Sequence, residues 1–129
     1  MDEPQNIYIG LDYAESAICK ARIWFPFVAW HVHDITRPLA SLLDWHCSTA
    51  LCIETLEHIT EYRAALHNIF QSLKPGGVAL FTVPNNDGLK QHVNHWTLDT
   101  FTDLMRQYGE AEVSLFHGGN NLIAKVVKR

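Results

Sequence analysis

IYIGLD, residues 7–12, is the stretch of sequence from which the fold of this chain is inferred. It is short and apolar and ends in the carboxylate of Asp12, as a buried strand of an α/β sheet does. The next segment, Tyr13–Arg22 (YAESAICKAR), reads as the helix that follows such a strand. In nucleotide-binding α/β units a carboxylate at this place holds ribose hydroxyls, and a glycine-rich loop lies roughly 20 residues before it. Only eleven residues precede Asp12, and Gly10 is the only glycine among them, so the sequence predicts half of such a pocket.

Strands and helices alternate along the rest of the chain. Further strands are predicted at Phe27–His33, Thr49–Ile53 and Val78–Val83. Helices are predicted at Leu39–Leu43, at Tyr62–Leu73 with Thr60 as its N-cap, and at Leu98–Tyr108 with Thr97 as its N-cap. The chain ends in a predicted β-hairpin, Glu112–Phe116 and Leu122–Val127. This order predicts one α/β domain over residues 1–129, with a mostly parallel sheet and an antiparallel hairpin at its edge.

Acidic residues follow three of the predicted strands. Ligands of open parallel sheets bind beyond the carboxyl ends of the strands, and those ends are Asp12, Asp34, Glu54 and Pro84–Asn85. Three carboxylates at one edge suit a ligand that is rich in hydroxyls and amines or that carries positive charge.

Composition narrows the classes of function. The net charge of −4 and pI near 6.0 leave no basic surface for a nucleic-acid backbone. No apolar run approaches the roughly 20 residues that span a bilayer. The three cysteines, Cys19, Cys47 and Cys52, have no CxxC or zinc spacing, so reduced thiols and a cytoplasmic location are expected.

Five segments, in this order, resemble the class I S-adenosylmethionine-dependent methyltransferases. They are YIGLDYAESAICKAR, HVHDITRPL, LCIETLEHI, LKPGGVALFTVPN and HVNHWTLDTF, and the resemblance covers Ile7 to Val127. The nearest type is the broad bacterial group with an ExxEH segment after the fourth strand. The resemblance implies a Rossmann-like methyltransferase sheet with S-adenosylmethionine as cofactor. It also implies a sheet truncated at its N-terminus, because the family's first strand, glycine-rich loop and following helix find no match here.

The resemblance implies a role for each strand-end residue. Asp12 is expected to bind the ribose hydroxyls, with Tyr13 packed beside them, and Asp34 is expected to accept from the adenine amine, with Ile35 against the base. Residues 52–54, among them Ile53 and Glu54, would line the methionine end of the cofactor.

Histidines near the ExxEH segment suggest two further roles. Glu54, Glu57 and His58 lie at i, i+3 and i+4, so a helical turn would project all three to one side. Together with His92 or His95 they are candidate ligands for Mg²⁺, Mn²⁺ or Zn²⁺. The alternative is that Glu57 and His58 only buttress the site or cap a helix. His58 and His92 are also candidates for a general base that takes a proton from an acceptor.

Two functions remain open at this stage. One is methyl transfer to an O or N acceptor on a small molecule, with a second chain or a neighbouring copy supplying the absent strand. The absent strand would sit between the strands that contain Ile7 and Thr49 and would leave two unpaired edges. Because unpaired edges can bind strands of other chains, the second function is that of a catalytically silent relic that serves as a binding or assembly module. Neither a membrane nor a nucleic acid is expected as a partner.

Overall fold

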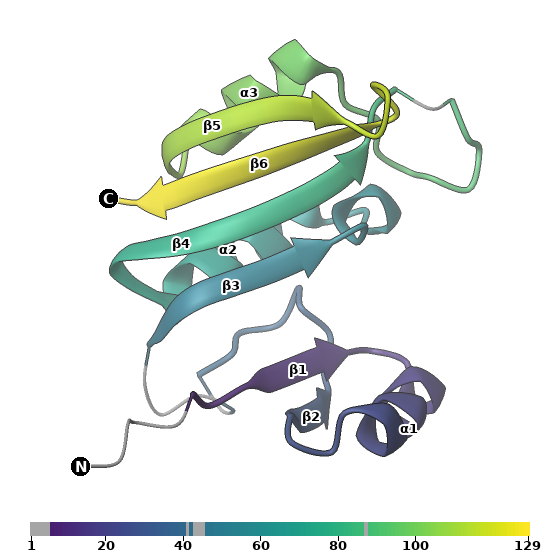
Figure 1. The fold of residues 1–129 in the computed structure, drawn as a ribbon, viewed down its shortest axis with the longest axis vertical. Coiled ribbons are helices and arrows are strands. Elements are labelled where there is room, and N and C mark those ends of the chain that lie inside the picture. Colours follow the sequence, from purple (N-terminus) through teal and green to yellow (C-terminus); the bar gives the residue numbers. More distant parts are fainter. Residues whose placement is uncertain (1–5, 41, 43–45, 87) are drawn as a thin grey trace.

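A computed structural model describes residues 6–129 except 41, 43–45 and 87. Within these residues the strands form two sheets (Figure 1). A two-stranded sheet contains β1 (Ile9–Asp12) and β2 (Ala29–Val32), and a four-stranded sheet has the order β3-β4-β6-β5. The bounds of the latter strands are Cys47–Ile53 for β3, Leu73–Pro84 for β4, Gly109–Phe116 for β5 and Asn121–Lys128 for β6. The helices are α1 (Glu15–Trp24), α2 (Tyr62–Ser72), α3 (Leu98–Arg106) and a 3₁₀ turn, η1 (Leu56–His58).

The directions of the strands confirm the predicted α/β sheet. β1 and β2 are parallel, and so are β3 and β4. The C-terminal hairpin is antiparallel, with β6 against β4 and β5 outermost. The fold is therefore a Rossmann-like sheet whose antiparallel element lies at one edge.

The two sheets are separate because no ladder joins β1 to β3 in the described part of the chain. Ala29 N–H donates to the Tyr8 carbonyl over 2.9 Å, and His33 N–H donates to the Asp12 carbonyl over 2.9 Å. Alternate residues of a parallel strand face the same neighbour, so the backbone groups of Ile9 and Leu11 face the other, unpaired edge. The gap predicted between these two strands is present, and its two edges have not closed on each other (Figure 1).

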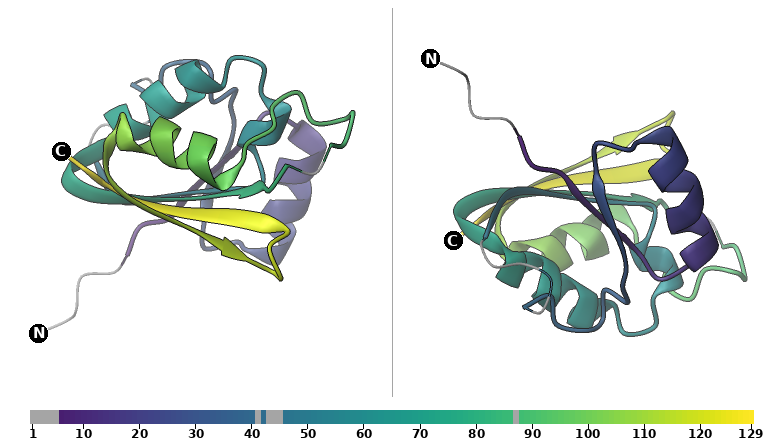
Figure 2. Two further views of the ribbon diagram at one scale, coloured as in Figure 1. Left: turned by 90° about the horizontal axis from the view of Figure 1, so that it is seen from above. Right: turned by 90° about the horizontal axis from the view of Figure 1, so that it is seen from below.

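The hydrophobic core lies between the four-stranded sheet and two helices. α2 and α3 cover the same face of that sheet (Figure 2). Their apolar stripes and the inward residues of β4 and β6 are buried together: Ala65, Leu66, Ile69, Phe70, Phe101, Leu104, Met105, Ala79, Phe81, Val83, Leu122, Ala124 and Val126. On β3, by contrast, Leu51 and Ile53 are 67% and 53% exposed, so this strand is covered on one face only.

Glycine at position 10 is explained by the neighbouring strand. Gly10 is opposite Trp30 in the β1–β2 register, and a Cβ added to Gly10 would lie 2.1 Å from the indole ring. The Trp30 ring therefore packs directly on the glycine backbone, and any side chain at position 10 would force the ring to move.

The ends of the helices differ in part from the prediction. Thr97 caps α3 as expected, because its hydroxyl accepts from the Thr100 N–H over 3.2 Å. The prediction for Thr60 is wrong, since the N-cap of α2 is Glu61, which makes no side-chain capping bond. The predicted helix Leu39–Leu43 lies partly outside the described residues, and Leu39 and Leu42 form a turn closed by a 2.9 Å hydrogen bond. Among the helices described, none has the length and apolarity needed to cross a membrane.

Candidate functional site

Asp12 is the last residue of β1, and Asp34 follows the end of the adjacent parallel strand β2 by two residues, so both lie at the same edge of the small sheet. The backbone of Asp12 accepts from His33, the residue before Asp34, so the two strand ends are in register. Asp12 Oδ1 accepts from the Ala14 N–H over 2.8 Å. Asp34 Oδ1 accepts from both the N–H and the hydroxyl of Thr36, over 2.9 and 2.8 Å. Each carboxylate thus closes its own turn through Oδ1, and within the described part of the chain no donor reaches its Oδ2.

The charge state of Asp34 follows from these contacts. The hydrogen bonds from the backbone and hydroxyl of Thr36 lower the pKa of Asp34 below its usual range. The carboxylate is therefore ionised at neutral pH and acts as an acceptor only.

Tyr13 and Ile35, the predicted apolar neighbours of these acids, differ in environment. The Tyr13 side chain is 81% exposed. Ile35 is half-buried against the main core, and its carbonyl accepts from Asn68 Nδ2 over 2.8 Å. Ile35 is thus fixed to α2, whereas Tyr13 lies at the surface.

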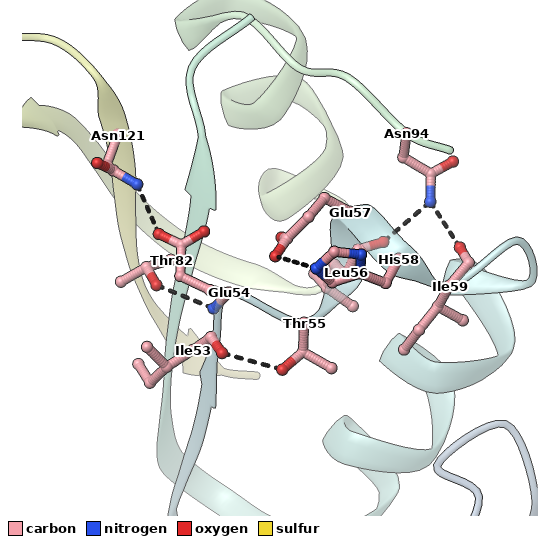
Figure 3. A network of polar contacts seen from close by, with 10 residues as sticks. All are labelled: Ile53, Glu54, Thr55, Leu56, Glu57, His58, Ile59, Thr82, Asn94 and Asn121. Atoms are coloured by element: carbon pink, nitrogen blue, oxygen red, sulfur yellow. Dashed lines mark hydrogen bonds and ion pairs between the residues drawn. The ribbon is translucent and has the colours of Figure 1, made fainter. Parts of the chain in front are cut away.

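Glu54 is held at the end of β3 in a strained backbone conformation. Its φ is 49°, in the left-handed region, and its N–H donates to the carbonyl and the hydroxyl of Thr82 over 2.9 and 3.1 Å. Its Oε1 accepts from Asn121 Nδ2 over 2.6 Å (Figure 3). Ile53 precedes it, with its carbonyl accepting from the Thr55 hydroxyl over 3.0 Å. These contacts place a carboxylate at the end of the sheet beside the hairpin.

Glu57 is buried although it is a carboxylate. It is 1% exposed, and its Oε2 has no hydrogen-bond partner among the described residues. Its Oε1 lies 3.6 Å from Nε2 of His58, which is itself exposed (Figure 3). Burial raises the pKa of Glu57, and the charge of Glu54 adds to that effect.

His58 and His92 lie near Glu57, and His95 lies beside His92. The rings of His58 and His92 are 4.8 Å apart and edge-to-face, and those of His92 and His95 are 6.5 Å apart. His58 and His92, the two candidate bases, lie on different elements. His58 is on η1, and His92 is on the loop before α3.

Asn94 fixes this loop to η1. Its amide donates to the carbonyls of Leu56 and Ile59 over 2.9 and 2.5 Å (Figure 3). The N–H groups of Val93 and Asn94 both donate to the carbonyl of Glu57. The loop is therefore held against the backbone of η1 at Glu57, whose side chain is buried.

The predicted metal ligands do not form a metal centre in the described chain. No three His, Cys, Asp or Glu side chains among the described residues are grouped so that they could hold an ion. Glu57 is buried, whereas Glu54 and His58 are exposed and Glu54 is bonded to Asn121. Because η1 is a 3₁₀ turn that begins after the left-handed Glu54, the helical spacing on which the metal prediction depended is absent.

A surface hollow lies elsewhere. It has a volume of about 510 Å³ and is lined by Leu98, Asp99, Thr102, Asp103, Arg106 and Val113. None of the strand-end carboxylates lines it, so it is separate from the candidate site.

Sequence reasoning missed three residues of the site: Thr82, Asn94 and Asn121. Each acts on a residue 28 to 67 positions away in the chain. For Asn121 alone, the strand pairing could have indicated a place in the site. Asn121 is opposite Pro84 at the end of β4, which lies near the end of β3.

A family model described as a methyltransferase domain matches residues 3–114 of the chain. No curated protein sequence matches. Solved structures do, and one is the N-methyltransferase NodS from Bradyrhizobium japonicum WM9 in complex with S-adenosyl-L-homocysteine. It is 18% identical with a TM-score of 0.75, and the match covers 95% of this chain and 66% of NodS.

Two further structures are similar to this chain. A TehB-like S-adenosylmethionine-dependent methyltransferase from Corynebacterium glutamicum ATCC 13032 Kitasato is 19% identical, with a TM-score of 0.71 and coverage of 95% and 68%. A chain from the complex between the Haloferax volcanii Trm112 methyltransferase activator and a methyltransferase is 13% identical, with a TM-score of 0.72 and coverage of 93% and 71%. This chain therefore spans about two thirds of the length of these three relatives, and at such identities the likeness shows the fold.

Proposed function

The chain belongs to the methyltransferase-domain family of S-adenosylmethionine-dependent proteins with a Rossmann-like fold, and we propose that it binds S-adenosylmethionine and transfers a methyl group to a small molecule. The acceptor atom is an oxygen or a nitrogen. The observation that carries the proposal is the pair of carboxylates at the ends of β1 and β2, each with one oxygen left to accept from a ligand.

The adenosine half of the cofactor fits these residues. Asp12 Oδ2 would accept from the ribose hydroxyls and Asp34 Oδ2 from the adenine amine, while Tyr13 and Ile35 would supply apolar contacts to the sugar and the base. Hydroxyl and amine groups can donate to these carboxylates. The two side chains are already oriented by their own turns, so binding costs little further side-chain entropy.

The methionine half would lie at the end of β3, beside Ile53 and Glu54. The Glu54 carboxylate is oriented by Asn121, and a fixed carboxylate suits the ammonium group of an amino acid. When bound, the cofactor supplies an electrophilic methyl group. The chain's own part is then to align the acceptor and, through His58 or His92, to take its proton.

A second candidate function is a catalytically silent binding or assembly module. The observation that favours it is the pair of unpaired edges on β1 and β3, since open edges recruit strands from other chains. A second chain or a second copy that completes the sheet would also serve the first function. One similar structure comes from a complex with a methyltransferase activator, which supports such an arrangement. We place the protein in the cytoplasm, because its three cysteines are all free thiols.

Thermal shift with S-adenosylmethionine and S-adenosylhomocysteine distinguishes the two functions. A ligand at about 100 times its Kd stabilises the folded state by about 2.7 kcal/mol, so millimolar ligand should raise the Tm of the wild type measurably. Asp12→Asn and Asp34→Asn keep the oxygen that closes each turn but replace the free oxygen with an amide donor. Each variant should lose most of the shift.

Glu112→Gln is the matched control, because Glu112 is an exposed carboxylate on β5. Its shift should equal that of the wild type. A wild type that shows no shift with either ligand would favour the silent module, and a shift that both Asp variants retain would contradict the assignment of the two carboxylates.

A further inference from the structure

Exposed apolar side chains gather at the amino ends of β1 and β2. Ten of the thirteen large apolar side chains that are exposed in the described chain belong to the segment from Ile7 to Ile53. Six of these precede β1, end α1 or lie between α1 and β2, and we call them the amino-edge surface: Ile7 (70% exposed), Tyr8 (51%), Ile23 (79%), Trp24 (77%), Phe25 (51%) and Phe27 (68%).

Ring contacts join the centre of this surface. The Tyr8 and Phe27 rings are 5.9 Å apart, and the Phe25 and Phe27 rings are 6.3 Å apart, both edge-to-face. The indole of Trp30 donates to the Phe25 carbonyl over 2.9 Å and so fixes the turn that carries the two phenylalanines. The aromatic side chains are thus held in place while they are exposed, which lowers the entropy that binding would cost.

The amino-edge surface is large enough for a stable protein interface. An aromatic side chain buries about 150–250 Å², so these six side chains together expose on the order of 700 Å² of apolar area. Monomeric proteins usually show no apolar patch above about 300–600 Å², and a standard interface buries about 800 Å² on each partner. The estimated area therefore matches one side of a dimer.

The chemistry of the surface favours an identical partner. Residues 23–28 (IWFPFV) contain no charged group, so a partner cannot be selected here by ion pairs. The six side chains carry no charge, so two copies of the surface meet without repulsion, and a two-fold axis brings the same residues of two copies together. The net charge of −4 also disfavours an anionic lipid or a nucleic acid as the occupant.

We propose that the amino-edge surface is the interface between two copies of this chain in a two-fold dimer. The surface lies at the amino ends of the strands, and Asp12 and Asp34 lie at the carboxyl ends. The dimer therefore leaves the strand-end carboxylates open. The proposal does not depend on methyl transfer, and it holds equally for a silent module.

Sedimentation equilibrium over about 1–100 µM tests the dimer. The wild type should have twice the chain mass of 14.7 kDa at the upper concentrations. Trp24→Glu and Phe27→Glu should each have the mass of one chain, because a charge would be buried without a partner in the interface. Leu115→Glu is the matched control: Leu115 is 46% exposed on β5, away from the surface, and its variant should remain a dimer.

Circular dichroism shows whether each variant is folded. If Phe27→Glu is unfolded, Ile23→Lys replaces it, since Ile23 is 79% exposed and contributes little to the core. A wild type with the mass of one chain throughout would overturn the proposal. So would folded Trp24→Glu and Ile23→Lys variants that remain dimers, or self-association that only Leu51→Lys on β3 abolishes. A monomer that co-sediments with phosphatidylcholine vesicles would show that the surface binds lipid instead.

Discussion

Glu57 stands out among the single residues because its carboxylate is buried and one of its oxygens lacks a partner in the described chain. Burial raises its pKa above the ordinary value of 4.5. Because the pKa is higher in the folded state than in the unfolded state, protonated Glu57 contributes its full share to the stability of the fold below pH 4.5. This contribution is lost as the pH rises through the folded-state pKa. Glu57 therefore destabilises the fold at neutral pH, and such a cost is usually retained for function.

Glu57→Gln should remove this cost. The neutral amide needs no proton to be buried, so we expect its Tm at pH 7.5 to exceed that of the wild type by roughly 3 °C or more, the equivalent of about 1 kcal/mol. At pH 4.5 the difference should shrink. Differential scanning calorimetry between pH 4.5 and pH 8 measures it, with the exposed Glu112→Gln as control. A variant that is less stable than the wild type at pH 7.5 would show that the charged form of Glu57 has a partner.

Single residues of the site were predictable where the reason for them is local. Asp12, Asp34 and Glu54 follow from the rule that ligands bind at the carboxyl ends of parallel strands, and the strands indeed end at or near them. The burial of Glu57 and the roles of Asn94 and Asn121 were not predictable. They depend on contacts 38 and 67 residues apart, and no pattern of neighbouring residues records such contacts.

At the level of elements, α3 shows how much one cap contributes. Thr97 and Thr100 form a reciprocal capping box, in which Thr97 accepts from the Thr100 N–H and Thr100 Oγ1 accepts from the Thr97 N–H. Thr97→Ala should lower the free energy of unfolding by about 1 kcal/mol, because the N–H of Thr100 loses the Thr97 hydroxyl as its partner. Urea denaturation measures the change.

Thr60→Ala is the matched control for Thr97→Ala. Thr60 resembles a cap in the sequence but does not cap α2, so its replacement should change the stability by less than about 0.5 kcal/mol. Equal losses at both positions would contradict the assignment of the caps.

The kind and order of the elements could be read from hydrophobic periodicity, but some of their ends could not. β4 begins at Leu73, before the predicted Val78, because Leu73 pairs with Cys47 across the sheet. Residues 74–77 lie within β4, but the printed register passes from Leu73 opposite Cys47 to Val78 opposite Thr49, so these four residues form an irregularity of the ladder. Local propensity predicts where a helix ends, and only the partner strand decides where the next strand begins.

For the whole molecule, the separation of the two sheets predicts unequal stability. A two-stranded sheet with one short helix is marginal by itself, and Ile18 is the one fully buried side chain described on α1. Hydrogen exchange should therefore show lower protection for amides of β1, α1 and β2 than for amides of β3, β4 and β6. Mass spectrometry of deuterated fragments measures this, and equal protection in both regions would mean that the two sheets unfold together.

The overall architecture was predictable because strand and helix alternate, and the gap was predictable because the glycine-rich loop finds no match in the sequence. The amino-edge surface was not predicted, since IWFPFV has the composition of a core segment and only the fold shows it exposed. Exposure depends on what covers a segment, and a single sequence does not contain that information.

The facing edges of β1 and β3 have a consequence for the energetics of the molecule. A strand inserted between them would make two ladders in one step and so join the halves mechanically. The two sheets would then unfold together. Calorimetry that resolves two melting transitions for the chain alone would resolve one transition after the strand is inserted. Binding of a peptide strand between β1 and β3 would thus change how cooperatively the protein unfolds.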